Sequence, residues 1–332
     1  MSTATIGRAE VAAPARRLRG LYWLVGRQIR ALLWTLAVAV AVVTGLLLYL
    51  HRADGDAMAQ MRQAGCLSPG VGGTRAGCWE IAKQLIGPGE LFTQYLQPAL
   101  VGFPLLVGMF VGAPLMAQEY ERGTTRLIWT QSASRTRWLA VRIGLPGVAV
   151  VLAAGALAAI TTWFWHADML HSVVMFDPPF QGLTYPVLGL FPIAFTLFAL
   201  VLGTAVGTLL RRTLPAVIVT GVLLGAVEFV LRLLRSHLVP GVYQFHQGRS
   251  DMFLQPNNAW LLSSGTVLPD GSKVAVADCA PGRPCAASHS FYLYFQPVSH
   301  FVQIQLVESG ILLVLGAAIL ALVVRQVRSS AA

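Results

Sequence analysis

The chain has 332 residues, of which 55% are hydrophobic and only 11% charged, and its formal net charge is +10. A composition this apolar excludes the surface of a water-soluble globular protein and indicates an integral membrane protein. Because one helical crossing of a bilayer needs about 20 mainly apolar residues, the chain can hold about half a dozen crossings and their loops.

The first predicted element is a basic helix at about residues 14–30, with the sequence ARRLRGLYWLVGRQIR from Ala15 onward. At helical spacing Leu18, Tyr22 and Ile29 share one face, and arginines occupy the opposite one. This pattern predicts an amphipathic helix that rests in the cytoplasmic interface of the membrane, and an ordinary basic flank is the alternative. The candidate interfacial residues are Arg16, Arg19, Tyr22, Trp23, Arg27 and Arg30.

Six stretches of sufficient length carry little or no charge, and each is predicted to be a transmembrane helix. They cover residues 31–50, 97–118, 143–165, 184–210, 213–234 and 302–324. Short alternating strands are not evident, so the expected fold is an all-α integral membrane domain that spans residues 1–332.

The basic residues predict the orientation of these spans, because Lys and Arg are retained on the cytoplasmic side. With the N-terminus inside, the inner pieces contain fifteen of the 24 Lys and Arg residues. Both termini are therefore expected in the cytoplasm, and the outer loops are expected at residues 51–96, 166–183 and 235–301. The positive charge is a signal of topology and lipid head groups, and nucleic-acid binding is not expected.

All four cysteines fall in predicted outer loops, which face an oxidising compartment. Two disulfides are expected, most simply Cys66 with Cys78 and Cys279 with Cys285, although three pairings are open. A metal site is the weaker reading, because no cysteines form a C-x-x-C pair and histidines at ligand spacing are missing.

Between the second and third predicted spans lies the polar stretch AQEYERGTTRLIWTQSASRTRW. Gly123 should end the preceding helix, and Thr124 or Thr125 can cap a short new one. That short helix would display Leu127, Ile128 and Trp129 on the cytoplasmic side. Docking on a partner and insertion into the lipid interface both account for such an apolar cluster.

The longer segment MAQEYERGTTRLIWTQSASRTRWLAVR resembles the region after the second helix in type-two ABC transporter permeases, particularly actinobacterial ones. There a Glu-Tyr-Glu-x-Gly-Thr run precedes a Trp-Thr-Gln-Ser-x-x-Arg-x-x-Trp run. Elsewhere the resemblance is one of architecture: six spans, both termini inside, a basic N-terminal helix and a long last outer loop. The long first outer loop with its cysteines departs from the compact version of the fold.

The resemblance implies that this segment is a coupling helix docking on an ATP-binding subunit. The residues carried over by position are Glu119, Glu121, Gly123, Arg126, Leu127, Ile128, Trp129, Ser134 and Arg135. The chain has no G-x-x-x-x-G-K-[ST] phosphate loop, so ATP and Mg²⁺ are expected on a separate subunit and no cofactor or catalytic residue on this one. The resemblance further implies a second permease copy, a bacterial plasma membrane and outward movement of an amphipathic or hydrophobic compound.

Glu228 and Arg232 lie four residues apart in the fifth predicted span, so they can neutralise each other. They are either part of an export path or a structural pair. No other intramembrane acid is expected. This argues against the alternative function of an ion- or proton-coupled carrier, which usually needs several ionisable groups within the membrane. A membrane-embedded enzyme is a further alternative.

Glycine pairs and prolines predict how the spans pack. Three G-x-x-x-G pairs favour close helix contact within the chain over dimerisation, and they are Gly108 with Gly112, Gly203 with Gly207, and Gly221 with Gly225. Three prolines should kink the second span, at Pro98, Pro104 and Pro114. The apolar run at residues 291–324 exceeds one span, so an interfacial or re-entrant helix is expected before the sixth crossing.

Overall fold

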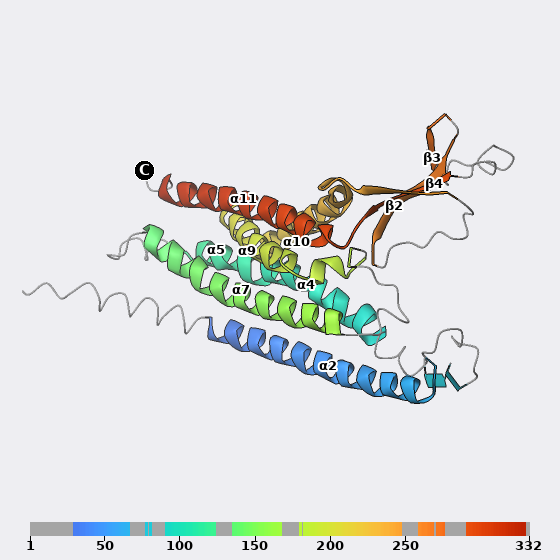
Figure 1. The fold of residues 1–332 in the computed structure, drawn as a ribbon. Coiled ribbons are helices and arrows are strands. Elements are labelled where there is room, and N and C mark those ends of the chain that lie inside the picture. The colour runs from blue at the N-terminus through green and yellow to red at the C-terminus, as the bar shows by residue number, and fades with distance from the viewer. Residues whose placement is uncertain are drawn as a thin grey trace, which may run out of the picture.

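The computed structural model describes residues 29–66, 77–78, 80–81, 90–123, 135–167, 179–180, 182–247, 258–268, 270–275 and 290–329. These residues form a bundle of long helices with a small antiparallel sheet at one end (Figure 1). Six helices of the bundle are long and apolar enough to cross a membrane, which confirms the predicted number of spans.

The first span is α2 (Arg30–Gln63), and the third is α7 (Arg135–Ala167). The second is continuous through η1 (Leu91–Leu96), α4 (Gln97–Leu106), η2 (Val107–Gly112) and α5 (Ala113–Glu121). The last three spans are α9 (Phe191–Leu210), α10 (Thr213–Leu234) and α11 (His300–Ser329). The short 3₁₀ turn η3 (Tyr185–Val187) precedes α9, and a second one, η4 (Arg235–His237), follows α10.

Helix α2 continues well beyond residue 50, where an outer loop was expected to begin. Its extension carries the buried residues Ala57, Met58 and Met61, which pack with Cys66 and Cys78. The helix therefore persists because this last part has its own small apolar cluster to cover.

The second span departs from regular α-helix at two π-helical turns, η1 and η2. Pro104 lies inside α4, and Pro98 and Pro114 lie in the first turns of α4 and α5. Proline cannot donate the backbone hydrogen bond that an α-helix requires, and π-helical turns are one way in which a helix accommodates such interruptions.

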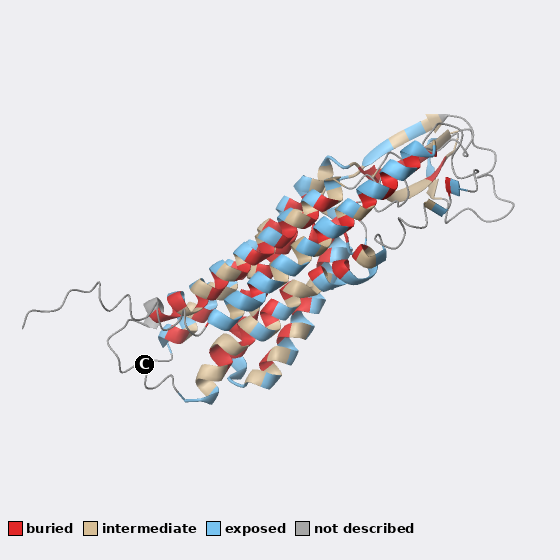
Figure 2. Cartoon of the chain, turned by 90° about the horizontal axis from the view of Figure 1, so that it is seen from below, coloured by how far each residue is buried: buried red, intermediate tan, exposed pale blue. Residues whose placement is uncertain are grey.

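Helix α9 lies at the centre of the bundle. In its most apolar 18-residue segment 72% of the residues are buried, whereas the corresponding share is at most 44% in the other spans. Figure 2 shows buried and exposed positions alternating along the helices, as expected for helices with one face packed and one face toward lipid.

Two of the three glycine pairs form the contact between the second span and α9. A Cβ atom on Gly112 would lie 2.6 Å from the carbonyl oxygen of Leu200, and one on Gly203 would meet the backbone of Gly108. These glycines therefore serve packing within the chain, as expected. At Gly225, in contrast, a Cβ atom would have no neighbour within 4 Å.

The segment predicted to be the last outer loop contains strands, which corrects the all-α prediction. The strands are β1 (Val242–Gln247), β2 (Trp260–Val267), β3 (Lys273–Ala275) and β4 (Ser290–Gln296), and they form one antiparallel sheet in the order β1-β4-β2-β3.

The prediction of an interfacial or re-entrant helix before the sixth crossing is also wrong. Residues 291–296 belong to β4, where Phe295 pairs with Val242 on one side and Leu261 on the other. The aromatic sequence SFYLYFQ has high β-propensity, and its apolar side chains fit a central strand with neighbours on both edges.

Aromatic contacts join the sheet to the bundle. The ring of Phe180 stacks on Trp260 of β2 at a centroid distance of 5.9 Å and meets Phe301 of α11 edge-on at 5.6 Å. Tyr185 also meets Phe301 edge-on at 5.6 Å. The sheet is thereby held close to the start of the sixth span (Figure 1).

Candidate functional site

The end of α5 is tied to α7 by an ion pair. Nη2 of Arg142 donates to Oε1 of Glu119 at 2.8 Å, and the two side chains are 13% and 15% exposed. Glu119 lies in the last turn of α5, and Arg142 lies two turns into α7. A charge-assisted hydrogen bond with little exposure therefore sets the spacing between the second and third spans at this end.

The same turn of α5 also holds the start of α10. Oε1 of Glu121 accepts a hydrogen bond from the backbone N–H of Thr213 at 2.8 Å, and Oε2 accepts one from the Thr213 hydroxyl at 2.7 Å. Arg212, the residue before α10, makes no side-chain cap of its own. The carboxylate of Glu121 thus caps α10 from a different helix, where the positive end of the helix dipole favours a negative charge.

Gly123 ends this turn as expected. Its φ is +66°, in the left-handed region that glycine adopts without strain, and its N–H donates to the carbonyl of Tyr120 at 3.2 Å. The guanidinium of Arg211 lies 5.4 Å from the centre of the Tyr120 ring. The Glu-Tyr-Glu-x-Gly run therefore contacts both α7 and the α9–α10 connection.

The remaining predicted coupling residues lie outside the described residues, so their role stays a prediction; they are Arg126, Leu127, Ile128, Trp129 and Ser134. Arg135 is the first residue of α7. The same holds for most of the predicted interfacial helix, since Arg16, Arg19, Tyr22, Trp23 and Arg27 precede the described part. Arg30 is the first residue of α2 and is exposed.

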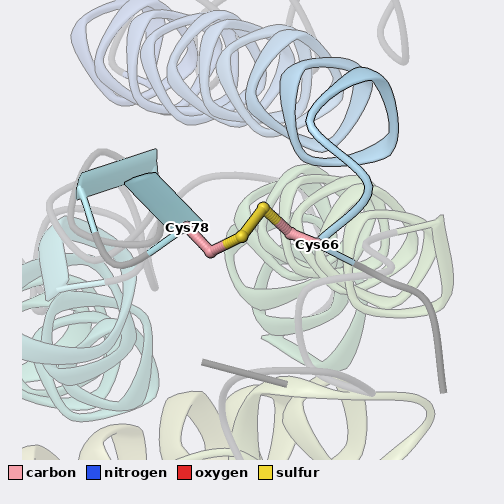
Figure 3. The surroundings of a disulfide bond; sticks show 2 residues. All are labelled: Cys66 and Cys78. Carbon is pink, nitrogen blue, oxygen red and sulfur yellow. A yellow bond between two sulfur atoms is a disulfide. The ribbon is translucent and has the colours of Figure 1, made fainter. Parts of the chain in front are cut away.

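At the opposite end a disulfide joins Cys66 and Cys78 (Figure 3). This is one of the two pairings that proximity in sequence favoured. The other predicted pair, Cys279 with Cys285, lies outside the described residues.

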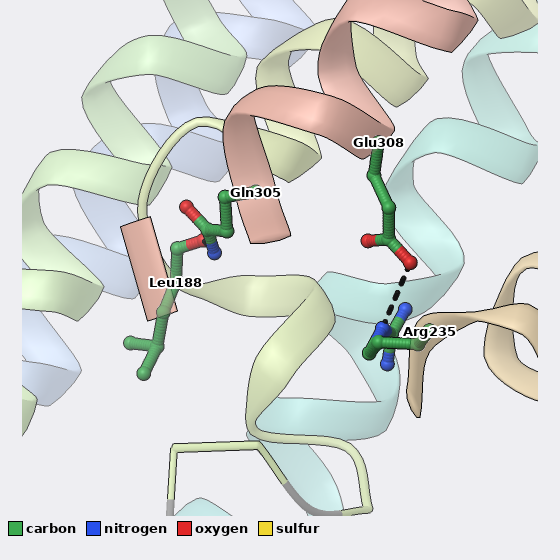
Figure 4. A network of polar contacts seen from close by, with 4 residues as sticks. All are labelled: Leu188, Arg235, Gln305 and Glu308. Atoms are coloured by element: carbon green, nitrogen blue, oxygen red, sulfur yellow. Dashed lines mark hydrogen bonds and ion pairs between the residues drawn. The ribbon is translucent and has the colours of Figure 1, made fainter. Parts of the chain in front are cut away.

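A buried ion pair lies between η4 and α11. Nε of Arg235 donates to Oε1 of Glu308 at 3.0 Å, and the side chains are 4% and 0% exposed (Figure 4). The guanidinium carbon also lies 3.6 Å from the centre of the Tyr185 ring. The aromatic face and the carboxylate together compensate for removing the guanidinium from water.

This finding corrects one expectation from the sequence. No contact ion pair joins Glu228 to Arg232, which are both among the described residues, and Arg232 is exposed, so their mutual neutralisation stays a prediction. Glu308 is a second acid within a span, although none besides Glu228 was expected. An acid in the otherwise uncharged segment VQIQLVESGILLVLG was the available signal, because such residues are normally paired.

Gln305 lies one turn before Glu308 and holds the segment that leads into α9. Its Nε2 donates to the carbonyl of Leu188 at 2.7 Å, and its Oε1 accepts from the N–H of Leu190 at 2.8 Å (Figure 4). Gly189 between them has φ +66°, and a Cβ atom there would collide with Gln305. One amide side chain thus satisfies two backbone groups of a non-helical turn.

Comparison with known protein families identifies the class. A family model described as ABC-2 membrane transporter related matches residues 37–235, which is more than half of the chain. The chain belongs to this family and is a type-two ABC transporter permease, a multi-pass transport subunit. The family implies partnership with an ABC ATP-binding subunit.

The match ends at Arg235, so the sheet and α11 lie beyond it. Neither a curated protein nor a solved structure matches the chain.

Proposed function

We propose that the chain pairs with a separate ATP-binding subunit and moves an amphipathic or hydrophobic compound out of a bacterial cell across the plasma membrane. Two copies of the permease pair around the transport pathway, and two ATP-binding subunits close on ATP beneath them. The segment at residues 124–134 is the coupling helix, with Leu127 and Trp129 as its docking side chains.

The observation that carries this proposal is the pair of carboxylates directly before that segment. Glu119 contacts α7 through Arg142, and Glu121 contacts α10 through Thr213. A displacement of the 124–134 segment would therefore act on the second, third and fifth spans together. Rigid-body movement of packed helices is an established route by which ATP-driven closure is transmitted.

The orientation follows from the same end of the bundle. The start of α2, the end of α5, the start of α7 and the end of α11 lie toward the same end of the bundle, away from the sheet (Figure 1). Basic residues predicted for the cytoplasm occur in these described pieces, such as Arg30, Arg122 and Arg325, which supports a cytoplasmic position for the coupling segment.

A pull-down with candidate ABC ATP-binding subunits from the same genome tests the proposal, using the one that the wild-type chain retains. The double change Leu127→Asp and Trp129→Asp should abolish association, because two charges would replace the apolar docking surface. The matched control is Leu183→Asp, an exposed leucine at the other end of the bundle, which should leave association unchanged. Full association of the double variant would remove this segment from the interface.

Transport itself needs a second measurement. The assembled complex in liposomes should hydrolyse ATP, and amphipathic compounds that are substrates should increase that rate. The double variant should lose this stimulation while the ATP-binding subunit alone keeps its basal hydrolysis. A complex that assembles but responds to none of a broad set of amphiphiles would contradict the proposed cargo class.

A further inference from the structure

A cavity of about 380 Å³ lies between the first turn of α2, the η2–α5 segment and α7. We refer to it as the α2–α5–α7 cavity. Its lining changes character along the second span: Phe110, Val111 and Leu115 come first, and Gln118, Glu119 and Arg122 follow toward the helix end. At 1.5 Å per residue, residues 110 and 122 are separated by about 18 Å along the helix, so the apolar and polar parts of the lining occupy different depths.

The polar part carries a net positive charge. Arg122 and Arg142 line it together with one acid, Glu119, whose carboxylate already accepts a hydrogen bond from Arg142 at 2.8 Å. Arg122 is exposed and directly follows the second candidate span, which ends at Glu121. The cavity therefore favours an anionic group at head-group depth and apolar chains further in.

A second cavity in the same bundle provides a contrast. It has a volume of about 580 Å³ and lies between α2 and the second span, where side chains such as Trp34, Val38, Phe103 and Leu106 line it. Its lining contains no charged residue. A lipid chain that fills this groove would gain nothing from an anionic head group, so any preference for anionic lipid must arise elsewhere.

We propose that the α2–α5–α7 cavity binds an anionic phospholipid of the leaflet next to the coupling segment, with its phosphate beside Arg122 and Arg142. The acyl chains lie along Leu32 and Phe110. Because Glu119 and Arg142 line the cavity and also join α5 to α7, the bound lipid stabilises the junction from which residues 124–134 extend. The cavity volume lies within the range of small-molecule sites, about 300–1,000 Å³, so it takes the head group and the first part of the chains, and the rest of each chain lies in the surrounding lipid.

The test uses the full chain purified in neutral detergent, without ATP or the ATP-binding subunit. Phosphatidylglycerol and phosphatidylcholine with identical acyl chains are titrated separately, and the midpoint of thermal unfolding is followed. A lipid that binds the folded state raises this midpoint as its concentration increases. The wild-type chain should respond at a lower concentration of phosphatidylglycerol than of phosphatidylcholine.

Arg122→Gln should weaken the response to phosphatidylglycerol about fivefold and leave that to phosphatidylcholine unchanged, as expected for one basic residue at the membrane surface. Arg122→Lys should keep most of the selectivity. The matched control is Arg232→Gln, which removes an exposed arginine near the other end of the bundle and should change neither response. Leu32→Trp, which fills the apolar part, should weaken the response to phosphatidylglycerol even if Arg122→Gln cannot be purified.

Three results would overturn the proposal. The first is an equal response of the wild-type chain to both lipids. The second is full selectivity for phosphatidylglycerol in Arg122→Gln or, if Arg122→Gln cannot be purified, an undiminished response to phosphatidylglycerol in Leu32→Trp. The third is stabilisation by glycerol phosphate alone as strong as that by phosphatidylglycerol, which would indicate a site for a free anion. None of these results depends on ATP hydrolysis, so they leave the proposed transport function standing.

Discussion

Two ion pairs in the described part of the bundle lie at opposite ends and differ in depth. The side chains of Arg235 and Glu308 are 4% and 0% exposed, whereas those of Arg142 and Glu119 are 13% and 15% exposed. Removing a charge from water costs several kcal/mol per ion, and the deeper pair offsets this with a hydrogen bond and the ring of Tyr185. The shallower pair keeps some hydration, so it both costs and contributes less.

The contacts around the two ion pairs differ in the same way, with more buried contacts near the sheet and more exposed ones at the other end. Near the sheet, Gln305 bonds two backbone groups and a disulfide closes the end of α2. At the end with the Glu-Tyr-Glu run, Glu119 joins the second span to the third through a partly buried carboxylate, and Glu121 joins it to the fifth through an exposed one. The comparison indicates that polar contacts and the disulfide stabilise the sheet end more strongly. At the other end the polar contacts can rearrange at a lower cost in free energy.

Breaking the deep pair should have the largest effect. Arg235→Met leaves the Glu308 carboxylate buried without its partner, and we expect a loss of about 3–5 kcal/mol in the free energy of unfolding. Denaturant titration of the chain in detergent measures this. The double variant Arg235→Met with Glu308→Met should recover much of the loss, because neither charge remains. A single variant within about 1 kcal/mol of wild type would show that the pair contributes little.

Removing the disulfide should come next. Cys66→Ala with Cys78→Ala opens a loop with a sequence separation of 12, for which chain entropy predicts a loss of about 2–4 kcal/mol. The effect should be local to the end of α2, where Met58 and Met61 pack against the cysteines. Protease cleavage after residue 50 should therefore accelerate, with cleavage near Glu119 unchanged. Equal acceleration at both ends would contradict a local role.

Adding a methyl group between the second span and α9 should have an intermediate effect on the free energy of unfolding. This contact belongs to neither end of the bundle. Gly112→Ala places a Cβ atom 2.6 Å from the Leu200 carbonyl oxygen, so we expect a loss of about 1–3 kcal/mol from overpacking. Gly225→Ala is the matched control, because a Cβ atom there meets nothing within 4 Å. It should be neutral or stabilising by up to about 1 kcal/mol. Similar losses at both positions would argue against the close contact.

The shallow pair should matter least for stability and most for coupling. Glu119→Gln should reduce the free energy of unfolding by no more than about 1 kcal/mol, because the pair keeps partial solvent contact. It should nevertheless lower substrate-stimulated ATP hydrolysis in the assembled complex, since α5 loses its link to α7. Glu90→Gln, an exposed acid at the other end of the second span, is the control for a general charge effect. A loss of stability as large as that of Arg235→Met would erase the distinction between the two ends.

Much of the helical architecture was predictable from local sequence. The fifth span was expected at residues 213–234, which are the bounds of α10, because charged residues flank an apolar run of membrane length. The stop at Gly123 was predictable for a similar reason, since the αL conformation at a helix end strongly favours glycine.

The sheet and the polar partners were not predictable in this way. The apolar residues 291–296 satisfy the requirements of a helix and of a buried strand alike, and their pairing with β1 and β2 decided between the two. Glu228 has a cation four residues away in sequence, yet the intramembrane ion pair joins Arg235 to Glu308, 73 residues apart. Likewise Glu119 and Glu121 find their partners in α7 and α10.

The sequence by itself determined the membrane class and the number of spans, because hydropathy and span length depend on neighbouring residues alone, and one short segment carried the resemblance to the family. The tertiary structure decided which charges pair, which glycines touch and which segments between the helices become strands. Those outcomes depend on contacts between residues far apart in the chain, and a buried charge or an unpaired strand edge is stable only where another element supplies its partner.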